Sequence, residues 1–305
     1  MNELLFTIAI PTYNNEKTIK RAIDSALNQD TNVPYEILIV NNASDDNTAD
    51  ILNQYNDDKV RIITNEKTVS LFENHNICVK EGLGKYIIYC HSDDYLLGHV
   101  LKIYESKLAK RLFPNKYVVW GHSMFRDYSS TFIQQGGISY NEMSIGMYSP
   151  LPLLYSGLTP SGTCYSRKTL LAMGGFLDVF GTAPSDMSTM IYLAMNGFGF
   201  EMIDEMVFIR EDASTAPKAG EEDKYLQSLD YAFEPFIETV NREEVNYLIL
   251  LSRILKNKPY HFYYALAQDE GYKNEIKKYL PKQIMRHPWH LKSSFVRKLI
   301  KRLYS

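Results

Sequence analysis

The sequence predicts an α/β protein built on a mostly parallel sheet flanked by helices. Two observations carry this prediction: short apolar runs alternate with helically spaced apolar residues, and polar loops follow the apolar runs. Strands that alternate with helices favour a parallel sheet with right-handed crossovers. The chain has 305 residues, 45% hydrophobic and 23% charged, which allows one large domain or two modest ones and excludes a disordered chain.

The predicted elements follow in chain order. Strands are expected at 4–10, 36–40, 60–63, 86–90 and 117–121, and helices at 16–27, 49–55, 71–79 and 97–112. Residues 123–149 break the pattern and predict a hairpin or a substrate-facing loop, before a strand at 162–166 and a helix over 186–196. From about residue 221 helical patterns dominate. We therefore expect a domain over 1–215 and a helical C-terminal region over 216–305.

Cysteine usage and hydropathy bear on the compartment. Cys78, Cys90 and Cys164 are an odd number without metal-ligand spacing, so they are expected to be buried small hydrophobic residues in a reducing compartment. No apolar run approaches the roughly 18 to 20 residues that a membrane span needs, and the first residues do not form a signal peptide. These features predict a cytoplasmic protein.

The net charge of −3 is distributed unevenly. Residues 271–305 carry ten basic residues and one acidic residue, a net +9 that leaves −12 on residues 1–270. If residues 287–305 are helical, apolar residues share one face and basic residues flank it, which predicts an amphipathic helix on an anionic membrane surface. The alternatives are a helix that closes the core and a solvated C-terminus. Nucleic acid is not an expected partner, because the acidic body would repel phosphates.

Three polar loops follow predicted strands, and ligands of such sheets bind beyond the carboxyl ends of the strands. The first loop, 11–16, has neither the GxGxxG of a dinucleotide fold nor the GxxxxGK[ST] of a phosphate loop. An aromatic residue, Tyr13, flanked by hydrogen-bonding side chains suits a nucleobase. The alternative is a turn with a solvent-facing Tyr13 and a helix cap at Asn14 or Asn15.

The second and third loops carry amide and carboxylate groups. Asn41, at the end of its strand, offers a donor and an acceptor to a pyrimidine edge, whereas residues 44–46 suit the cap of the next helix. Ser92, Asp93 and Asp94 follow an apolar strand. Adjacent carboxylates recruit Mg²⁺ or Mn²⁺, which would bridge a diphosphate, although such pairs also cap helices.

Asp186 opens a predicted helix and is read either as an N-terminal acid favoured by the helix dipole or as a general base for an attacking hydroxyl. The preceding glycines at 174–175 predict a turn. The histidines His91, His99 and His122 form no nucleophile–base pattern and are interpreted as structural.

In their order and separations, these motifs resemble the family 2 inverting glycosyltransferases of GT-A fold. The matching segments, which cover roughly residues 4–215, are FTIAIPTYNNEKTIKRAIDSALNQ, YEILIVNNASDDNT, ENHNICVKEGLGKYIIYCHSDDYL, and SGTCYSRKTLLAMGGF with the following APSDMS. The resemblance implies a nucleotide-sugar donor and a divalent metal, Mn²⁺ or Mg²⁺.

The resemblance also implies roles for single residues. The residues predicted to contact the nucleotide-sugar donor are Pro11, Thr12, Tyr13, Asn14, Asn41, Asn74, Asn76, Ser92 and Asp93. Asp93 is the expected metal ligand, with Asp94 assisting from outside. Asp186 is the expected base in a single in-line displacement at the anomeric carbon.

The sequence departs from the family pattern at four places. Asn41 stands where an aspartate is usual, His91 replaces the first acid of the DXD motif, Ser185 replaces a glutamate, and Asp212 lies near a missing histidine beyond Arg210. The main interpretation is an inverting transferase that uses a UDP-sugar to extend a glycan on a lipid-linked or protein-linked acceptor in bacterial polysaccharide biosynthesis. The departures favour a non-catalytic nucleotide-sugar-binding module as the alternative. A sugar nucleotidyltransferase would need a glycine-rich basic loop after the first strand.

Overall fold

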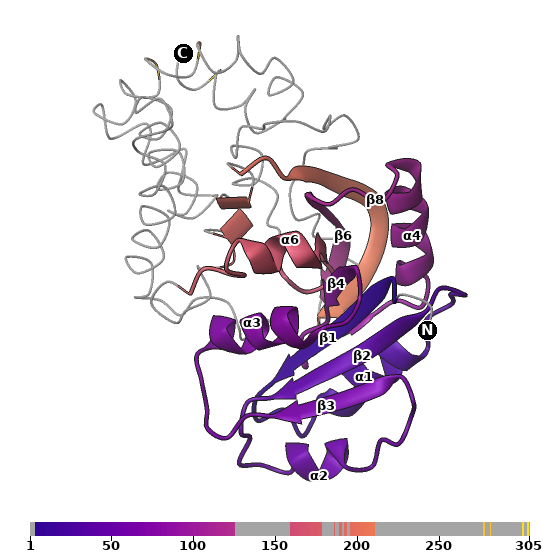
Figure 1. Cartoon of the computed structure of the whole chain (residues 1–305), viewed down its shortest axis with the longest axis vertical. Helices are drawn as coiled ribbons and strands as arrows, with labels where there is room; N and C mark the ends of the chain where they lie inside the picture. The colour runs from indigo at the N-terminus through magenta and orange to yellow at the C-terminus, as the bar shows by residue number, and fades with distance from the viewer. Residues whose placement is uncertain are drawn as a thin grey trace.

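The computed structural model describes residues 4–125, 159–178 and 196–210, with the single positions 186, 189, 190, 192, 193, 277, 281, 301 and 304. In this part of the chain, one eight-stranded sheet carries helices on both faces (Figure 1). The strands are β1 (Phe6–Thr12), β2 (Tyr35–Asn41), β3 (Val60–Thr64), β4 (Tyr86–Tyr89), β5 (Asp94–Leu96), β6 (Tyr117–Phe125), β7 (Cys164–Ser166) and β8 (Gly199–Arg210). The helices are α1 (Ile19–Leu27), α2 (Thr48–Leu52), α3 (Leu71–Glu81), α4 (Val100–Lys110) and α6 (Arg167–Ala172).

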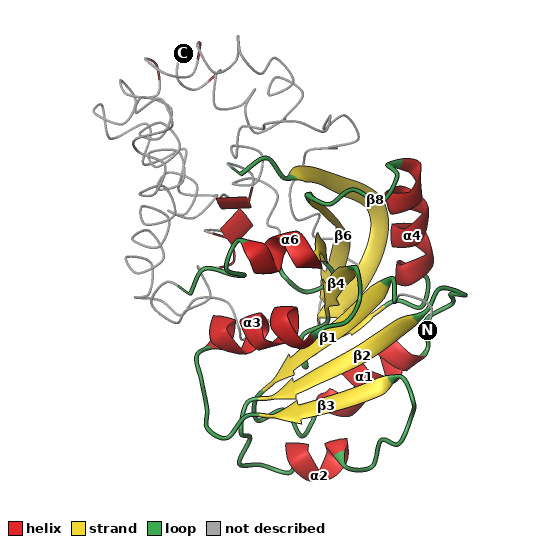
Figure 2. Ribbon diagram, in the orientation of Figure 1, coloured by secondary structure: helices red, strands yellow, loops and turns green. Residues whose placement is uncertain are grey.

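The sheet has a parallel half and a mixed half, in the order β3-β2-β1-β4-β7-β6-β8-β5. β3, β2, β1 and β4 are parallel, as the alternation of strands and helices predicts. β7 then runs antiparallel between β4 and β6, and β8 pairs parallel with β6 but antiparallel with β5. The long β8 curves across the top of this half (Figure 2). β5 follows β4 in the chain but pairs with β8, so it forms the edge of the sheet opposite β3.

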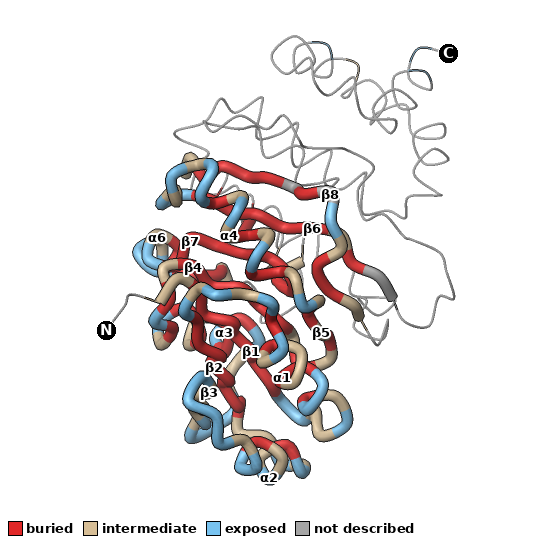
Figure 3. Tube along the Cα trace, turned by 90° about the vertical axis from the view of Figure 1, so that its right-hand side faces the viewer, coloured by how far each residue is buried: buried red, intermediate tan, exposed pale blue. Residues whose placement is uncertain are grey.

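Two apolar layers cover the two faces of the sheet. α1, α2 and α4 pack on one face with Ile8 and Ile10, and α3 and α6 pack on the other with Ala9 and Leu38. Successive side chains of a strand point to opposite faces, so both layers draw on the same strands. β1, β2 and β4 are buried along their whole length (Figure 3), as expected for strands covered on both sides. All three cysteines are free and buried, which confirms their interpretation as core residues.

A buried polar network joins the parallel strands near their amino ends. Glu36 of β2, 6% exposed, accepts hydrogen bonds from the Thr7 hydroxyl at 2.7 Å and the Leu83 amide at 2.5 Å. Arg61 of β3 donates to its second carboxylate oxygen at 3.0 Å. The Thr7 hydroxyl accepts in turn from the Gly84 amide at 2.9 Å. One carboxylate therefore connects β1, β2, β3 and the segment that leads into β4.

The predicted strands agree with β1, β2, β3, β4, β6 and β7 to within a few residues, and the predicted helices agree with α1 to α4. The apolar spacing predicts neither α6 nor β8, because α6 has only six residues and too few turns to show a helical repeat. The predicted hairpin or loop at 123–149 begins inside β6, and its remainder lies outside the described residues. Within the described chain, no helix is long and apolar enough to cross a bilayer.

Candidate functional site

The loops that follow β1 and β2 lie side by side at the carboxyl edge of the parallel strands. Thr12 and Asn41 are in register at the two strand ends. Beyond them, the backbone amide of Asn14 donates to the Ser44 hydroxyl at 3.0 Å, and its side-chain amide donates to Asp45 at 2.6 Å. The first strand-end loop is thus bonded directly to the second.

These two loops also begin the next helices. Asp46 accepts hydrogen bonds from the Thr48 amide at 2.9 Å, at the start of α2, and from the Glu16 amide at 3.0 Å. Asn14 and Ala43 have φ angles of 52° and 54°, in the left-handed region where asparagine is tolerated better than most residues. The N-cap residue of α2 is Asn47, which makes no side-chain cap bond, so Asp46 satisfies the first helical amide from the position before the cap. The loop bonds hold two left-handed residues in place.

Three side chains at this edge can meet a ligand. Thr12 is buried, and its hydroxyl has no hydrogen-bond partner among the described residues. Buried hydroxyls nearly always have a partner, so this one is available to a bound molecule. Asn41 Oδ1 accepts from Ser44 twice, at 3.1 Å and 2.6 Å, so the group that Asn41 could still offer to a base is its amide nitrogen, a donor. Tyr13, 45% exposed, follows the buried Pro11 and Thr12.

The two predicted asparagines of α3 hold neighbouring backbone. Asn74 donates to the Val40 carbonyl at 3.2 Å, at the end of β2. Asn76 donates to the Phe176 carbonyl at 2.9 Å and accepts from the Phe176 amide at 2.7 Å, so both ends of its side-chain amide bind one residue. Gly175 before it has a φ of 83°, which confirms the predicted glycine turn. Direct contact of either asparagine with a donor stays a prediction.

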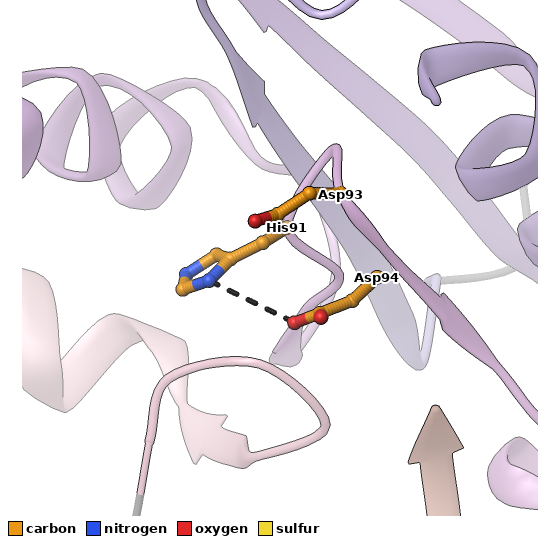
Figure 4. A group of neighbouring side chains, drawn as sticks. All are labelled: His91, Asp93 and Asp94. Atoms are coloured by element: carbon orange, nitrogen blue, oxygen red, sulfur yellow. Dashed lines mark ion pairs between the residues drawn. The ribbon is translucent and has the colours of Figure 1, made fainter. Parts of the chain in front are cut away.

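A tight turn between β4 and β5 gathers His91, Asp93 and Asp94. The Asp94 amide donates to the His91 carbonyl at 2.9 Å, and Ser92 between them is buried. One ligand atom from each of His91, Asp93 and Asp94 lies within 4.8 Å of the others, and the three side chains extend to one side of the turn (Figure 4). The expectation that Asp94 assists from outside is not met, because Asp94 is the first residue of β5 and is only 2% exposed.

The carboxyl group of Asp94 is buried, and burial changes its acidity. Burial raises the pKa of this carboxyl to about 7, Asp93 adds to the rise, and the Arg210 guanidinium opposes it. Arg210 of β8 reaches Asp94 because the two residues are in register, with Arg210 Nε 3.6 Å from Asp94 Oδ1. Asp94 Oδ2 has no hydrogen-bond partner within the described chain. A carboxylate oxygen left in this way is a natural cation ligand.

Two buried histidines meet beside this turn. His75 of α3 is 1% exposed, and its Nε2 lies 3.0 Å from Nε2 of His91. Burial lowers the pKa of both imidazoles to about 3, and electrostatic repulsion lowers it further: His91 acts on His75, and Arg210 acts on His91. Both rings are therefore neutral near pH 7, and the 3.9 Å approach of His91 Nδ1 to Asp94 Oδ2 is not an ion pair there.

A family profile and the solved structures of other proteins identify the chain's relatives. The profile described as glycosyl transferase family 2 matches residues 7–168, more than half of the 305 residues. The chain belongs to glycosyl transferase family 2. The matched range includes both strand-end loops, α3 and the turn that carries His91, Asp93 and Asp94.

Among curated relatives of this family 2 chain, a UDP-Glc:alpha-D-GlcNAc-diphosphoundecaprenol beta-1,3-glucosyltransferase of Escherichia coli is 27% identical over 147 residues. That match covers 47% of this chain and 56% of the enzyme, so the chain spans about half the length of this relative.

Solved structures with similar folds extend over more of the chain. S. aureus TarS 1-349 in complex with UDP-GlcNAc has a TM-score of 0.64 and 17% identity, over 89% of this chain and 81% of that one. A mannosyltransferase from Pyrobaculum calidifontis in complex with GDP-Man and Mn²⁺ has a TM-score of 0.56 and 16% identity, over 97% and 85% of the two chains. Identities this low establish the fold alone, and the predicted GT-A architecture is confirmed.

In this family 2 chain, Asp186 is helical and half-buried. Burial raises the pKa of Tyr165 in β7 well above its usual value, and the charge of Asp186 adds to the rise, which places this carboxylate near β7. β7 pairs with β4, the strand that leads to His91. Ser185 and Asp212 lie outside the described residues.

Sequence reasoning missed His75 and read His91 as structural. The available signal was a histidine in the first position of the DXD-like motif and a second histidine on the apolar face of the preceding helix. Helical spacing alone makes such a histidine a core residue, and only the packing of α3 against the end of β4 brings the two rings together.

Proposed function

We propose that this chain is an inverting glycosyltransferase that moves a sugar from a nucleotide-sugar donor, UDP-linked, to a hydroxyl of a glycan. The acceptor is lipid-linked or protein-linked, as expected for polysaccharide biosynthesis. The named E. coli relative transfers from UDP-Glc to a diphosphoundecaprenol-linked sugar, and TarS binds UDP-GlcNAc, which supports both halves of the proposal.

One observation carries this proposal. The loops after β1 and β2, which are bonded to each other, and the His91, Asp93 and Asp94 turn after β4 all lie at the carboxyl ends of parallel neighbours. A nucleoside diphosphate needs a base-binding edge and a site of positive charge within reach of each other. The hydroxyl of Thr12 and the amide of Asn41 support the first, and the side chains of His91, Asp93 and Asp94, which could hold a cation, support the second.

The residues at the turn fit a divalent cation. Asp94 Oδ2 is buried without a hydrogen bond to any residue that the structure describes, Asp93 contributes a second carboxylate, and His91 contributes an imidazole. We expect these groups to hold Mn²⁺ or Mg²⁺. A cation bound there would offset the negative charge of the departing nucleoside diphosphate.

Asp186 is our candidate for the general base. In the proposed reaction the acceptor oxygen forms a bond to the anomeric carbon while the bond from that carbon to the diphosphate oxygen breaks on the opposite side. The hydroxyl proton passes to the Asp186 carboxylate, and the electron pair of the broken bond leaves with the diphosphate. Inversion at the anomeric carbon follows from this single displacement.

A donor screen tests the proposal. The full chain is incubated with UDP-, GDP- and dTDP-sugars and Mn²⁺, and the release of nucleoside diphosphate is measured with and without glycan acceptors. We expect nucleoside diphosphate from a UDP-sugar, and more of it when an acceptor is present. Exchange of pyrophosphate would instead indicate a nucleotidyltransferase. Binding of UDP-sugars without release of nucleoside diphosphate would indicate a binding module, the alternative favoured by the residues at 41 and 91.

A further inference from the structure

The hydrogen bonds of His75 define which of its nitrogens carries a proton. His75 Nδ1 lies 2.7 Å from the carbonyl oxygen of Leu71, one turn earlier in α3. A carbonyl can only accept, so Nδ1 must be the donor and must carry the hydrogen. The other nitrogen of this ring, Nε2, then bears a lone pair whenever the ring is neutral.

The surroundings of His75 keep this ring neutral. The rings of Phe72, Tyr89 and Phe176 lie 5.2 Å, 5.0 Å and 5.8 Å from it, centroid to centroid, and a fourth ring, that of His91, lies at 5.1 Å. No carboxylate is paired with His75 among the described residues. A buried imidazolium without a counter-ion is strongly disfavoured, so His75 Nε2 is an acceptor.

This acceptor fixes the state of His91. Nε2 of His91 lies 3.0 Å from Nε2 of His75, which bears a lone pair. His91 must therefore carry its hydrogen on Nε2 and donate it to His75. The second nitrogen of His91, Nδ1, then bears a lone pair. Nδ1 is the atom on the side of the carboxylates, and Figure 4 shows it directed at Asp94.

His91 Nδ1, which carries no hydrogen, therefore faces a carboxylate oxygen of Asp94. His91 Nδ1 and Asp94 Oδ2 are 3.9 Å apart, too far for a hydrogen bond, and Asp94 Oδ2 has no other hydrogen-bond partner in the described chain. Two ligands of one cation, with bonds of about 2.1 Å each, lie roughly 3 to 4 Å apart. The separation suits a shared cation.

We propose that His91 binds the divalent cation through Nδ1, together with Asp93 and Asp94, and that His75 is a positioning residue that fixes the tautomer of His91. This inference rests on the proposed function for the presence of a cation and adds a nitrogen ligand and its support. Imidazole nitrogen favours transition metals over Mg²⁺, which prefers oxygen ligands. The chain should therefore bind Co²⁺ and Mn²⁺ in preference to Mg²⁺.

The tautomers are tested in the wild-type chain without any substitution. Long-range ¹H–¹⁵N spectra of histidine-labelled protein should show one ring protonated at Nδ1 and a partner protonated at Nε2, assigned to His75 and His91 by their loss in His75→Phe and His91→Ala. Titration with Zn²⁺, which gives sharp spectra, should shift the Nδ1 signal of His91. A His91 ring protonated at Nδ1 would overturn the proposal.

Metal binding is tested by calorimetry with CoCl₂ or MgCl₂ alone, without a donor. We expect His91→Ala to weaken Co²⁺ binding by more than 100-fold, and His75→Phe, which keeps an aromatic ring in the cluster, to weaken it by about 10- to 100-fold. His91→Asp should lower the ratio of Co²⁺ to Mg²⁺ affinity at least tenfold, because it exchanges the nitrogen ligand for an oxygen ligand.

His99→Gln is the matched control. The His99 side chain lies outside the cluster and, among the described residues, bonds the Met206 carbonyl at 2.9 Å, an oxygen to which glutamine can also donate. It should bind Co²⁺ as the wild type does. Thermal unfolding reports whether each variant is folded. Wild-type affinity for Co²⁺ in His91→Ala, or no Co²⁺ binding by the wild type, would overturn the proposal. These measurements contain no sugar donor, so they test the metal site independently of the transferase reaction. If only the proposed function fails, the chain will bind metal through His91 but release no nucleoside diphosphate.

Discussion

Thr12 and Thr7 lie on the same strand and are both buried, yet their hydroxyls differ in what they bind. Thr7 is bonded to Glu36 and to the Gly84 amide, whereas Thr12 has no hydrogen-bond partner among the described residues. A buried hydroxyl without a partner costs free energy in the unliganded protein and can recover it on binding a ligand. Thr7 therefore stabilises the fold, whereas the hydroxyl of Thr12 is available to a nucleotide-sugar ligand.

Replacing Thr12 by valine tests this distinction. Thr12→Val removes no side-chain hydrogen bond to any residue that the structure describes, so the free energy of unfolding should stay the same or rise. UDP binding should weaken by about 5- to 30-fold, or roughly 1 to 2 kcal/mol. Thr7→Val is the matched control on the same strand: it should destabilise the protein by about 1 to 3 kcal/mol and leave UDP affinity nearly unchanged. Calorimetric titration with UDP and urea unfolding measure the two effects. Equal loss of UDP affinity in both variants would contradict the assignment.

Asp186→Asn tests the proposed base. The amide cannot take the proton of the acceptor hydroxyl, so transfer should fall by about 10²- to 10⁴-fold while the affinity for donor changes little. Initial rates of nucleoside diphosphate release with acceptor measure the first quantity, and calorimetry with the donor measures the second. Turnover comparable to the wild type would remove Asp186 from the reaction.

At the scale of elements, the two edges of the parallel strands have different tasks. The carboxyl edge carries the loops and the turn of the candidate site, whereas the amino edge is joined by the carboxylate of Glu36. Because the site loops are held to each other by side-chain bonds at one edge, the spacing of the strands beneath them has to be fixed elsewhere. Glu36 provides this connection across β1, β2 and β3.

Glu36→Ala should therefore destabilise the fold. The substitution leaves Thr7 and the Leu83 amide without their acceptor and Arg61 without its partner, which we expect to cost about 3 to 5 kcal/mol. Lys20→Ala is the control, because Lys20 is 71% exposed in its ion pair with Asp24 and should contribute less than about 1 kcal/mol. Urea unfolding of both variants measures the difference. A similar decrease in the free energy of unfolding of both variants would show that the buried network of Glu36 contributes little to stability.

At the scale of the whole molecule, segments far apart in the sequence complete the candidate site. The backbone amide of His91 donates a hydrogen bond to the Ser161 hydroxyl oxygen at 3.2 Å. Arg210 lies against Asp94 through the pairing of β5 with β8. The charge of the chain is also divided, with an acidic body and a basic segment after residue 270. The predicted domain boundary at 215 and the amphipathic tail at 287–305 lie outside the described residues apart from positions 301 and 304.

Removal of the tail tests the predicted membrane surface. The full chain should float with vesicles of anionic lipid, and residues 1–286 should not, because the tail carries five basic residues that each contribute about 1 kcal/mol near such a surface. Vesicles of zwitterionic lipid are the control, and salt should weaken binding by screening. Equal flotation of the two proteins, or none by either, would contradict a membrane role for the tail.

Local sequence patterns were sufficient to predict most strands and the candidate loops of this protein. Buried strands such as β1 and β2 are continuous apolar runs that end in polar loops, so strand positions and the candidate loops follow from the sequence. Asp93 and Asp94 were recognisable as adjacent carboxylates after such a strand. The sequence does not indicate which of the two carboxylates is buried, because the burial of Asp94 depends on the pairing of β5 with β8.

The sequence by itself determined the alternation of strands and helices, the carboxyl-edge loops, the family resemblance and the division of charge, because each of these is set by neighbouring residues. Only the tertiary structure decided that His75 and His91 touch, that the Thr12 hydroxyl has no hydrogen-bond partner in the described part of the chain, and that Asp94 faces an imidazole nitrogen. These relations join residues from different elements. They depend on packing and burial, which residue spacing along the chain does not specify.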